Sequence, residues 1–162
     1  MTMIIYTNHP SPLGIITIAA ENGAIVALLL PGQTCTYIKD AVNGITLELQ
    51  AAILWLDDYF AGRIPTTRIS LAPKGTPFQQ SVWQLLRQIP YGQSTTYGSL
   101  AKKLSKTMSA QAVGQAVGKN PISIMIPCHR VLGSGGALTG YAGGLDKKIA
   151  LLDLEKIPYQ QN

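Results

Sequence analysis

A cysteine and a histidine stand side by side in a chain that has few of either. Cys128 and His129 lie in the stretch NPISIMIPCHRVLG, residues 120–133, and the chain of 162 residues contains only two cysteines and two histidines. A free thiol is only a few per cent thiolate at neutral pH, so a neighbouring base must raise that fraction before the sulfur can attack a carbon atom. Glu155 is the best-placed acid in this half of the chain to fix the tautomer of His129. The three residues together indicate nucleophilic catalysis, which a thiol hydrolase would also use.

The residues before Cys128 predict the element that positions it. Isoleucines alternate with Ser123 and Met125 over 122–126, a pattern typical of a half-buried strand, and Pro127 should end that strand. Successive residues of a strand point to opposite faces, so Cys128 and His129 can meet only through a turn after Pro127 or through a bridging water. The alternative is that Cys128 is simply a small buried apolar residue, the commonest fate of a free cysteine.

Charge divides the chain into two parts. The net charge is +5 although only 13% of the residues are charged. Residues 1–73 carry a net charge of −2 and residues 74–162 a net charge of +7. The sign changes within APKGTP, residues 72–77, where two prolines and a glycine favour a linker. We therefore expect domains at 1–73 and 74–162, the second suited to a polyanion such as DNA, although a merely soluble basic surface is the alternative.

The hydrophobic pattern predicts an α/β fold class. In the first part we expect a β-hairpin over 11–32, signalled by an Asn-Gly turn, then a helix over 46–60 and a strand over 65–71. The second part is predicted to be mainly helical, with amphipathic segments at 78–89, 94–104, 109–120 and 146–156. The two short helices within about 95–119 form a helix-turn-helix pattern.

The predicted helix over 109–120 has two unlike faces. Its apolar face comprises Ala112, Val113, Ala116 and Val117. Its other face comprises Gln111, Gly114, Gln115, Gly118 and Lys119. Each interior glycine costs roughly 1 kcal/mol relative to alanine, so a close approach of another backbone should compensate. A DNA minor groove and a tightly packed neighbouring helix both satisfy this requirement.

The second part resembles the O6-alkylguanine-DNA alkyltransferase family, the suicide DNA-repair proteins. The resemblance lies in IPCHRV, LTGYAGG and LLDLE, and it extends from GTPFQQSVWQLLRQIPYGQSTTYGSLA through AVGQAVGKNPISIMIPCHRV. The first part is similar only loosely, through SPLG and LDDYFAG. By this resemblance the first part should be a small RNase-H-like α/β domain, and the second a mainly helical domain with a helix-turn-helix.

The resemblance implies roles for the central residues. Cys128 matches the alkyl acceptor, His129 the base that acts on it through a water, and Glu155 the acid that orients the histidine. Tyr97 matches the tyrosine that donates to guanine N3 and helps to turn the target nucleotide out. Asn120 matches the hinge asparagine between the helix-turn-helix and the active-site segment.

The resemblance also implies which residues face DNA. The residues expected to contact DNA in the minor groove are Gln111, Gly114, Gln115, Gly118, Lys119 and Arg130. Those expected to form the base pocket are Pro127, Val131, Tyr141, Ala142, Gly143 and Lys148. Gln111 departs from the family, which usually carries at this position an arginine that fills the gap left by the extruded base.

The expected function is DNA repair by direct reversal. The alkyl group of O6-alkylguanine, and of O4-alkylthymine, would pass irreversibly to Cys128 in a single turnover, after the base is flipped out. The alternatives are a lesion-binding protein without repair activity and a thiol hydrolase. We expect no cofactor and no metal, since CxxC and HxxxH spacings are absent. We also expect a cytoplasmic monomer without a membrane partner, and we assign no role to Cys35.

Overall fold

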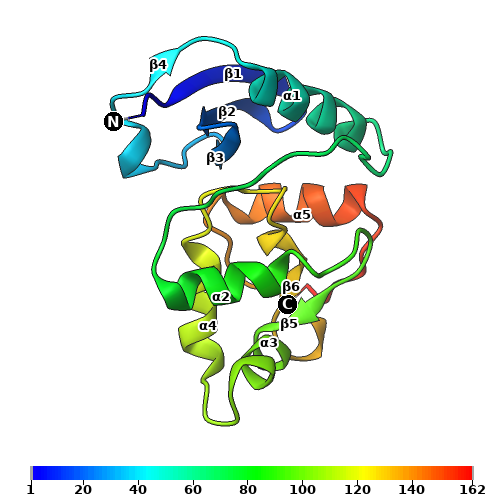
Figure 1. Cartoon of the computed structure of the whole chain (residues 1–162). Coiled ribbons are helices and arrows are strands. Elements are labelled where there is room, and N and C mark those ends of the chain that lie inside the picture. The colour runs from blue at the N-terminus through cyan, green and yellow to red at the C-terminus, as the bar shows by residue number, and fades with distance from the viewer. Residues whose placement is uncertain (1, 162) are drawn as a thin grey trace. The chain divides into compact units, whose positions relative to one another are not determined.

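The computed structural model describes residues 2–161. The chain forms two compact units, Met1–Lys74 and Gly75–Asn162 (Figure 1). Within the described residues, no helix combines the length and apolar character needed to cross a membrane.

The first unit is a small sheet covered by one helix. The sheet has the order β3-β2-β1-β4, in which the strands are β1 (Ile5–Ser11), β2 (Gly14–Glu21), β3 (Ala24–Leu29) and β4 (Val42–Asn43). The helix α1 (Leu47–Phe60) packs against β1, β2 and β3, and a short 3₁₀ helix, η1, spans Thr36–Ile38 (Figure 1). The core between them contains Ile16, Ile18, Leu28, Leu49 and Leu56, all fully buried.

Local signals in the sequence account for the β2-β3 hairpin and the helix of this unit. The predicted hairpin is confirmed, because β2 and β3 pair antiparallel around Asn22 and Gly23, which both adopt positive φ. The predicted helix over 46–60 begins after Thr46, whose side chain accepts from the Leu49 N–H. The strand expected over 65–71 is reduced to a single bridge between Leu71 and Ile25. The sequence analysis missed β1, since its Asn, His and Pro residues hide the alternation of a strand.

The second unit is mainly helical, with one small parallel ladder. Its elements are α2 (Pro77–Leu86), β5 (Thr95–Thr96), α3 (Tyr97–Leu104), α4 (Ala110–Gly118), η2 (Cys128–Arg130), β6 (Val131–Leu132), η3 (Ser134–Gly136) and α5 (Leu145–Leu154). The helix expected over 94–104 starts later, at Tyr97, because Thr95 and Thr96 pair with β6 instead. The buried Trp83 of α2 donates its indole N–H to the Ala116 carbonyl at 2.8 Å, which fixes α4 against α2.

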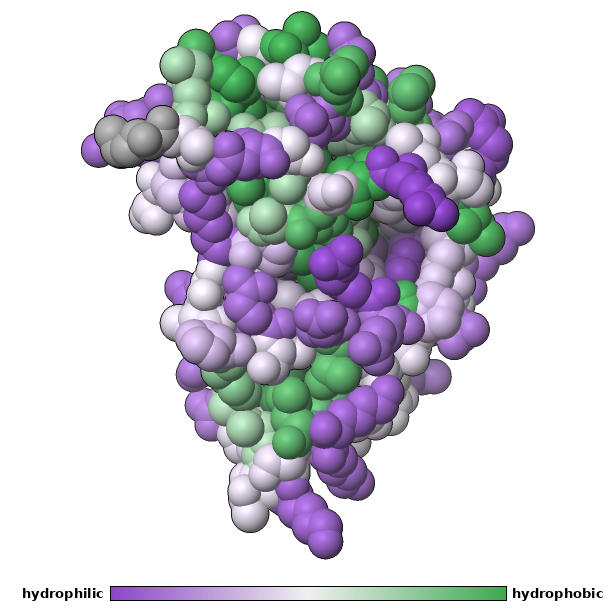
Figure 2. All heavy atoms as spheres, in the orientation of Figure 1, coloured by the Kyte–Doolittle hydropathy of each residue, from purple (hydrophilic) through white to green (hydrophobic). Residues whose placement is uncertain are grey.

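The caps of α3 and α4 define two short consecutive helices. Thr96 accepts from the Ser99 N–H, and Ser109 accepts from the Ala112 N–H, as the sequence predicts for Ser109. The buried residues of α4 are Val113, Ala116 and Val117, which belong to the predicted apolar face. The other face of α4 is exposed or half-buried. Apolar and polar residues are interspersed over the face of the molecule drawn in Figure 2.

The strand expected over 122–126 is wrong. Ile122, Ser123, Ile124 and Ile126 are all buried, so the alternation does not separate a core face from a solvent face. The backbone turns instead, with Ile124 at φ 71° and with hydrogen bonds from the Ile126 N–H to the Ile122 carbonyl and from the Cys128 N–H to the Ile126 carbonyl. The isoleucines recur because the whole turn is embedded in the core, and η2 follows it directly.

Asn120 holds this turn closed from inside. Its Nδ2 donates to the Ile126 carbonyl at 2.8 Å, and its Oδ1 accepts from the Ile122 N–H at 3.0 Å. The side chain is only 9% exposed, so water cannot replace these partners. The turn that carries Cys128 into place therefore depends on one amide side chain.

We expect Asn120→Ala to lower the free energy of unfolding by about 2–4 kcal/mol, because two buried backbone groups lose their partners. Urea denaturation of the purified variant measures this loss. Asn43→Ala, at an exposed residue of the first unit, is the matched control and should have little effect. Equal stability of the two variants would contradict the role given to Asn120.

Candidate active site

Cys128 is the first residue of η2, and its thiol is almost completely buried. The residue is 5% exposed, and its Sγ donates to the Oη of Tyr141 at 3.5 Å. Burial raises the pKa of the Cys128 thiol, while hydrogen bonds with Tyr141 and Asn120 and the charge of Lys148 act in the opposite direction. The resting site therefore holds a neutral thiol, and a base is needed to generate the nucleophile.

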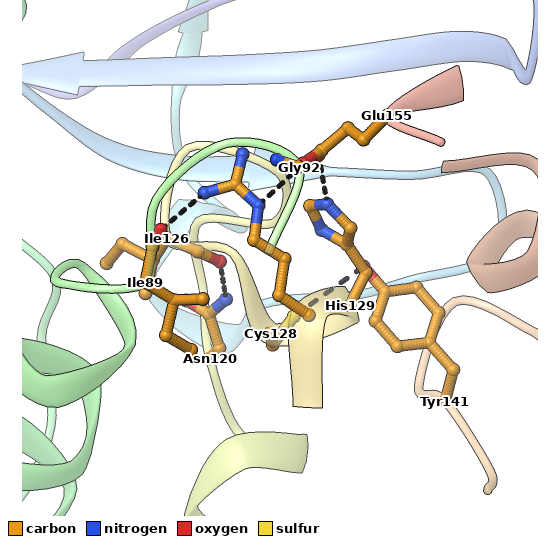
Figure 3. A network of polar contacts seen from close by, with 9 residues as sticks. Ile89, Gly92, Asn120, Ile126, Cys128, His129, Tyr141 and Glu155 are labelled. Carbon is orange, nitrogen blue, oxygen red and sulfur yellow. Dashed lines mark hydrogen bonds and ion pairs between the residues drawn. The ribbon is translucent and has the colours of Figure 1, made fainter. Parts of the chain in front are cut away.

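A buried carboxylate collects hydrogen bonds beside the thiol (Figure 3). Glu155, the C-cap of α5, accepts from His129 Nε2 at 2.6 Å through Oε2. Its Oε1 accepts from Arg130 Nε at 2.8 Å and from the Gly92 N–H at 3.0 Å. Gly92 adopts φ 80°, a left-handed conformation that glycine enters without strain, in the turn that follows α2. One side chain thus joins α5, η2 and the turn that follows α2.

This arrangement sets the protonation of the pair. Burial alone would raise the pKa of Glu155, but hydrogen bonds from His129, Arg130 and Gly92 outweigh it and lower the pKa to about 2. Burial lowers the pKa of His129, although the Glu155 carboxylate acts in the opposite direction. The imidazole is therefore neutral at pH 7. A carboxylate can only accept, so Nε2 carries the proton and Nδ1 is the basic nitrogen.

Arg130 does not lie where the sequence analysis expected it. We predicted a contact with DNA, but the residue is 8% exposed and its guanidinium is engaged inside the unit. Besides Glu155, it donates from Nη1 to the Ile89 carbonyl at 2.7 Å and lies 5.7 Å from the centre of the Tyr91 ring. Arg130 is buried because the buried carboxylate of Glu155 needs a cationic partner. We therefore assign Arg130 to the support of Glu155.

Lys148 and Tyr97 are connected on another side of the site. Lys148 is fully buried and donates from Nζ to the Val131 carbonyl at 2.7 Å and to Thr139 Oγ1 at 3.4 Å. Thr139 in turn donates to the Oη of Tyr97 at 3.3 Å. Burial raises the pKa of Tyr97, the hydrogen bond from Thr139 lowers it, and the nearby Cys128 raises it. The sequence analysis missed Thr139, although it lies within the motif LTGYAGG.

An open hollow lies beside the polar face of α4. Its lining residues are Tyr97, Ala110, Gln111, Gly114, Gln115, Thr139 and Gly140. A Cβ added at Gly118 would meet no atom within 4 Å, and one at Gly114 would make only an ordinary contact of 3.6 Å with the Tyr97 ring. Tight packing within the described residues therefore does not require these glycines.

The remaining predicted residues divide between buried and accessible positions. Gln111, Gln115 and Lys119 are exposed on α4. Pro127, Val131 and Gly143 are buried, Tyr141 is half-buried against Cys128, and Ala142 is exposed. Among residues 2–161, no three His, Cys, Asp or Glu side chains come close enough together to hold a metal ion.

Comparison with known proteins gives matches along both parts of the chain. Residues 4–73 match the family model described as 6-O-methylguanine DNA methyltransferase, ribonuclease-like domain, and residues 77–157 match that of its DNA binding domain. A methylated-DNA–protein-cysteine methyltransferase from Haemophilus influenzae is 44% identical, covering 98% of this chain and 90% of that protein. The constitutive Bacillus subtilis protein of the same name is 42% identical, with coverages of 96% and 98%.

A solved structure agrees with these sequence matches. The crystal structure of Mycobacterium tuberculosis OGT in complex with DNA superimposes with a TM-score of 0.87 at 40% sequence identity. The superposition covers 94% of this chain and 92% of that one. The predicted α/β fold class is thus confirmed.

The lowered pKa of Glu155 predicts a specific acid sensitivity. An unfolded Glu binds its proton near pH 4.5 and the folded one near pH 2, so the stabilisation is complete above pH 4.5 and disappears as the pH falls toward 2. Over this range the linkage amounts to roughly 3 kcal/mol of the free energy of unfolding. Urea denaturation between pH 2.5 and 7 measures this contribution to the free energy of unfolding. The pH series is run on the wild type, on Glu155→Gln and on Asp40→Asn, an exposed control.

We expect Glu155→Gln to be less stable at pH 7 and to lose this part of the acid dependence, whereas Asp40→Asn should follow the wild type. An acid profile of Glu155→Gln parallel to that of the wild type would show that folding does not lower the pKa of this carboxyl group.

Proposed function

Because this chain belongs to the 6-O-methylguanine DNA methyltransferase family, we propose that Cys128 is the residue that accepts the alkyl group. The protein repairs DNA by transferring an alkyl group from the damaged base to one of its own cysteines. The choice of cysteine rests on one observation, the hydrogen-bonded pair of His129 and Glu155 next to Cys128. Cys35 instead packs against apolar residues of the first unit.

The proposed reaction begins with loss of the thiol proton. Nδ1 of His129 takes it through a bridging water, while Glu155 stabilises the imidazolium that forms. The thiolate then attacks the alkyl carbon, the bond from that carbon to O6 breaks, and a sulfur–carbon bond forms. The electron pair of the broken bond leaves with guanine, and a proton from Tyr97 neutralises the base. The thioether product has no easy leaving group, so one molecule acts once. The same displacement fits O4-alkylthymine.

The proposed DNA surface is the polar face of α4. Three observations support it: the glycines have no internal packing role, Gln111, Gln115 and Lys119 are exposed, and residues 74–162 carry a net charge of +7. A glycine-faced helix is suited to a widened minor groove, where a bulkier helix would be excluded. The consecutive helices α3 and α4 would then act as a helix-turn-helix, with Asn120 at its exit. The target base must leave the stack, because its O6 cannot reach a buried thiol within a duplex.

Other features of the proposal follow from a single-use thiol. Cys128 must stay reduced until it meets a lesion, which favours action in a reducing cytoplasm. We propose that the protein acts there as a monomer. A protein that only binds lesions would not need the base beside the thiol. A thiol hydrolase would release its product and turn over repeatedly. Both alternatives therefore differ from the proposal in the state of the sulfur after reaction.

The decisive experiment is an intact-mass spectrum after mixing the protein with duplex DNA that contains O6-methylguanine. We expect the mass to rise by one methyl group, located on the peptide that contains Cys128, with one transfer for each protein molecule. Cys128→Ser should bind the same DNA with unchanged affinity and gain no mass. Repeated turnover, or a methyl group on Cys35, would rule out the proposed acceptor.

Gln111 should limit the rate of duplex repair. Its amide can hydrogen-bond an orphaned base but supplies neither charge nor a stacking plane. We expect Gln111→Arg to speed repair of duplex DNA roughly five- to a hundredfold. The arginine side chain could stack on a neighbouring base, and a stacking contact of this kind is worth about 1–3 kcal/mol. Gln111→Ala should slow it.

The control reaction for Gln111 is with the free base O6-benzylguanine, which requires no flipping. If the pocket admits the benzyl group, the rate of this reaction should be the same for the wild type, Gln111→Arg and Gln111→Ala. Rapid-quench kinetics on both substrates measure the rates. Identical duplex rates for the three proteins would show that Gln111 does not fill the gap.

A further inference from the structure

Three side chains form a continuous line from a buried charge to the open hollow. Nζ of Lys148 lies 3.4 Å from Oγ1 of Thr139, and that oxygen lies 3.3 Å from the hydroxyl of Tyr97. Nζ of Lys148 is also held at 2.7 Å by the Val131 carbonyl and lies 6.0 Å from the centre of the Tyr97 ring. Contacts within catalytic sites are often long before the substrate is bound and shorten afterwards.

The hydrogen bonds along this line run in one direction, from the lysine toward the tyrosine. An ammonium group has donors and no acceptor, so Thr139 Oγ1 accepts from Lys148. Thr139 then places its single hydroxyl hydrogen on the Tyr97 oxygen. The hydrogen of Tyr97 itself is left to serve another acceptor. Tyr97 and Thr139 both line the hollow beside α4, where the proposed substrate base would lie.

We propose that Thr139 is a positioning residue that couples the Lys148 ammonium to the Tyr97 hydroxyl, so that Tyr97 presents its hydrogen to the departing base. This inference rests on the proposed function and adds to it the residue that makes the tyrosine a directed acid. Hydrogen bonds in a chain polarise one another, most of all when the first donor is charged. Without the threonine hydroxyl, Lys148 would act on Tyr97 only through space, across its ring.

The proton balance of the step is complete with these groups. As the bond between O6 and the alkyl carbon breaks, the proton of the Tyr97 hydroxyl passes to the guanine base. The tyrosine oxygen takes the proton of Thr139, and Thr139 takes one from Lys148. The neutral lysine later regains a proton from water. The thiol proton leaves separately through His129, so neither side of the site has to serve both proton transfers.

The acidity of the groups agrees with this direction. Burial lowers the pKa of Lys148 to about 8, although Cys128 acts in the opposite direction. The lysine is thus mostly protonated at pH 7 but gives up its proton more readily than an exposed lysine. Burial raises the pKa of Tyr97, and the hydrogen bond from Thr139 acts against this increase. The lysine is therefore the readier proton donor of the line, and Thr139 is the group that moves Tyr97 toward donation.

The side chain of Thr139 suits a clean substitution. Its methyl group lies where a Cβ on Gly133 would come within 2.8 Å, so that carbon fills a defined space. Thr139→Val keeps both branches of the side chain and removes only the hydroxyl. Thr139→Ser keeps the hydroxyl and removes only the methyl group. The two variants separate the hydrogen bond from the packing, and Thr139→Ala is a second variant without a hydroxyl should valine fail to fold.

The test compares two electrophiles that differ in their leaving group. O6-methylguanine in duplex DNA releases a base that needs a proton, whereas methyl iodide releases iodide, which needs none. We expect Thr139→Val to slow methyl transfer from DNA roughly ten- to a hundredfold, the effect of losing one hydrogen bond to a charged chain. Methylation of Cys128 by methyl iodide, followed by peptide mass spectrometry, should keep its rate. Thr139→Ser should restore transfer from DNA.

Thr66→Val is the matched control, because it makes the same chemical change at an exposed position of the first unit. It should leave both rates unchanged. Equal rates of transfer from DNA for wild type and Thr139→Val would overturn the inference, and so would an equal loss with methyl iodide, which would indicate general damage to the site. A wild-type protein that transfers no methyl group from DNA would instead overturn the proposed function.

Discussion

The site depends on one buried carboxylate. Glu155 lies at the C-terminal end of α5, where the helix dipole disfavours an anion, and it is removed from water. It stays ionised because His129, Arg130 and the Gly92 N–H all donate to it. Two donors come from η2 and the third from the turn that follows α2, so the ion joins that turn, η2 and α5. The hydrogen bond that helps to stabilise this buried charge therefore also positions the histidine.

In the proposed reaction, one group of residues removes a proton and another supplies one. His129 is neutral and holds its proton toward Glu155, so its other nitrogen can act as a base. Lys148 and Tyr97 are connected through Thr139. Burial keeps Cys128 a neutral thiol at rest. In the proposed mechanism, it therefore reacts only when a damaged guanine is bound beside it. A nucleophile that can be used only once benefits from this restraint.

Much of this architecture could be predicted from local sequence signals. The Asn-Gly turn, the helix caps at Thr46 and Ser109 and the adjacent Cys128 and His129 depend on near neighbours, and the structure agrees with them. Features that depend on distant partners could not be read in this way. The turn over 122–126 resembles a strand because all its isoleucines are buried. Arg130 was predicted to contact DNA because its partner Glu155 lies 25 residues later in the sequence, and only the fold brings the two together.

The central claim is that Glu155 fixes the proton of His129 on Nε2 and so leaves Nδ1 as the base. Nitrogen-15 NMR of the imidazole in the full-length protein tests it most directly, because the two ring nitrogens give distinct shifts when protonated and unprotonated. At pH 7 we predict a neutral ring with a protonated Nε2 and an unprotonated Nδ1, and loss of this preference in Glu155→Gln. An imidazolium ring, or a proton on Nδ1 in the resting wild-type protein, would contradict the account.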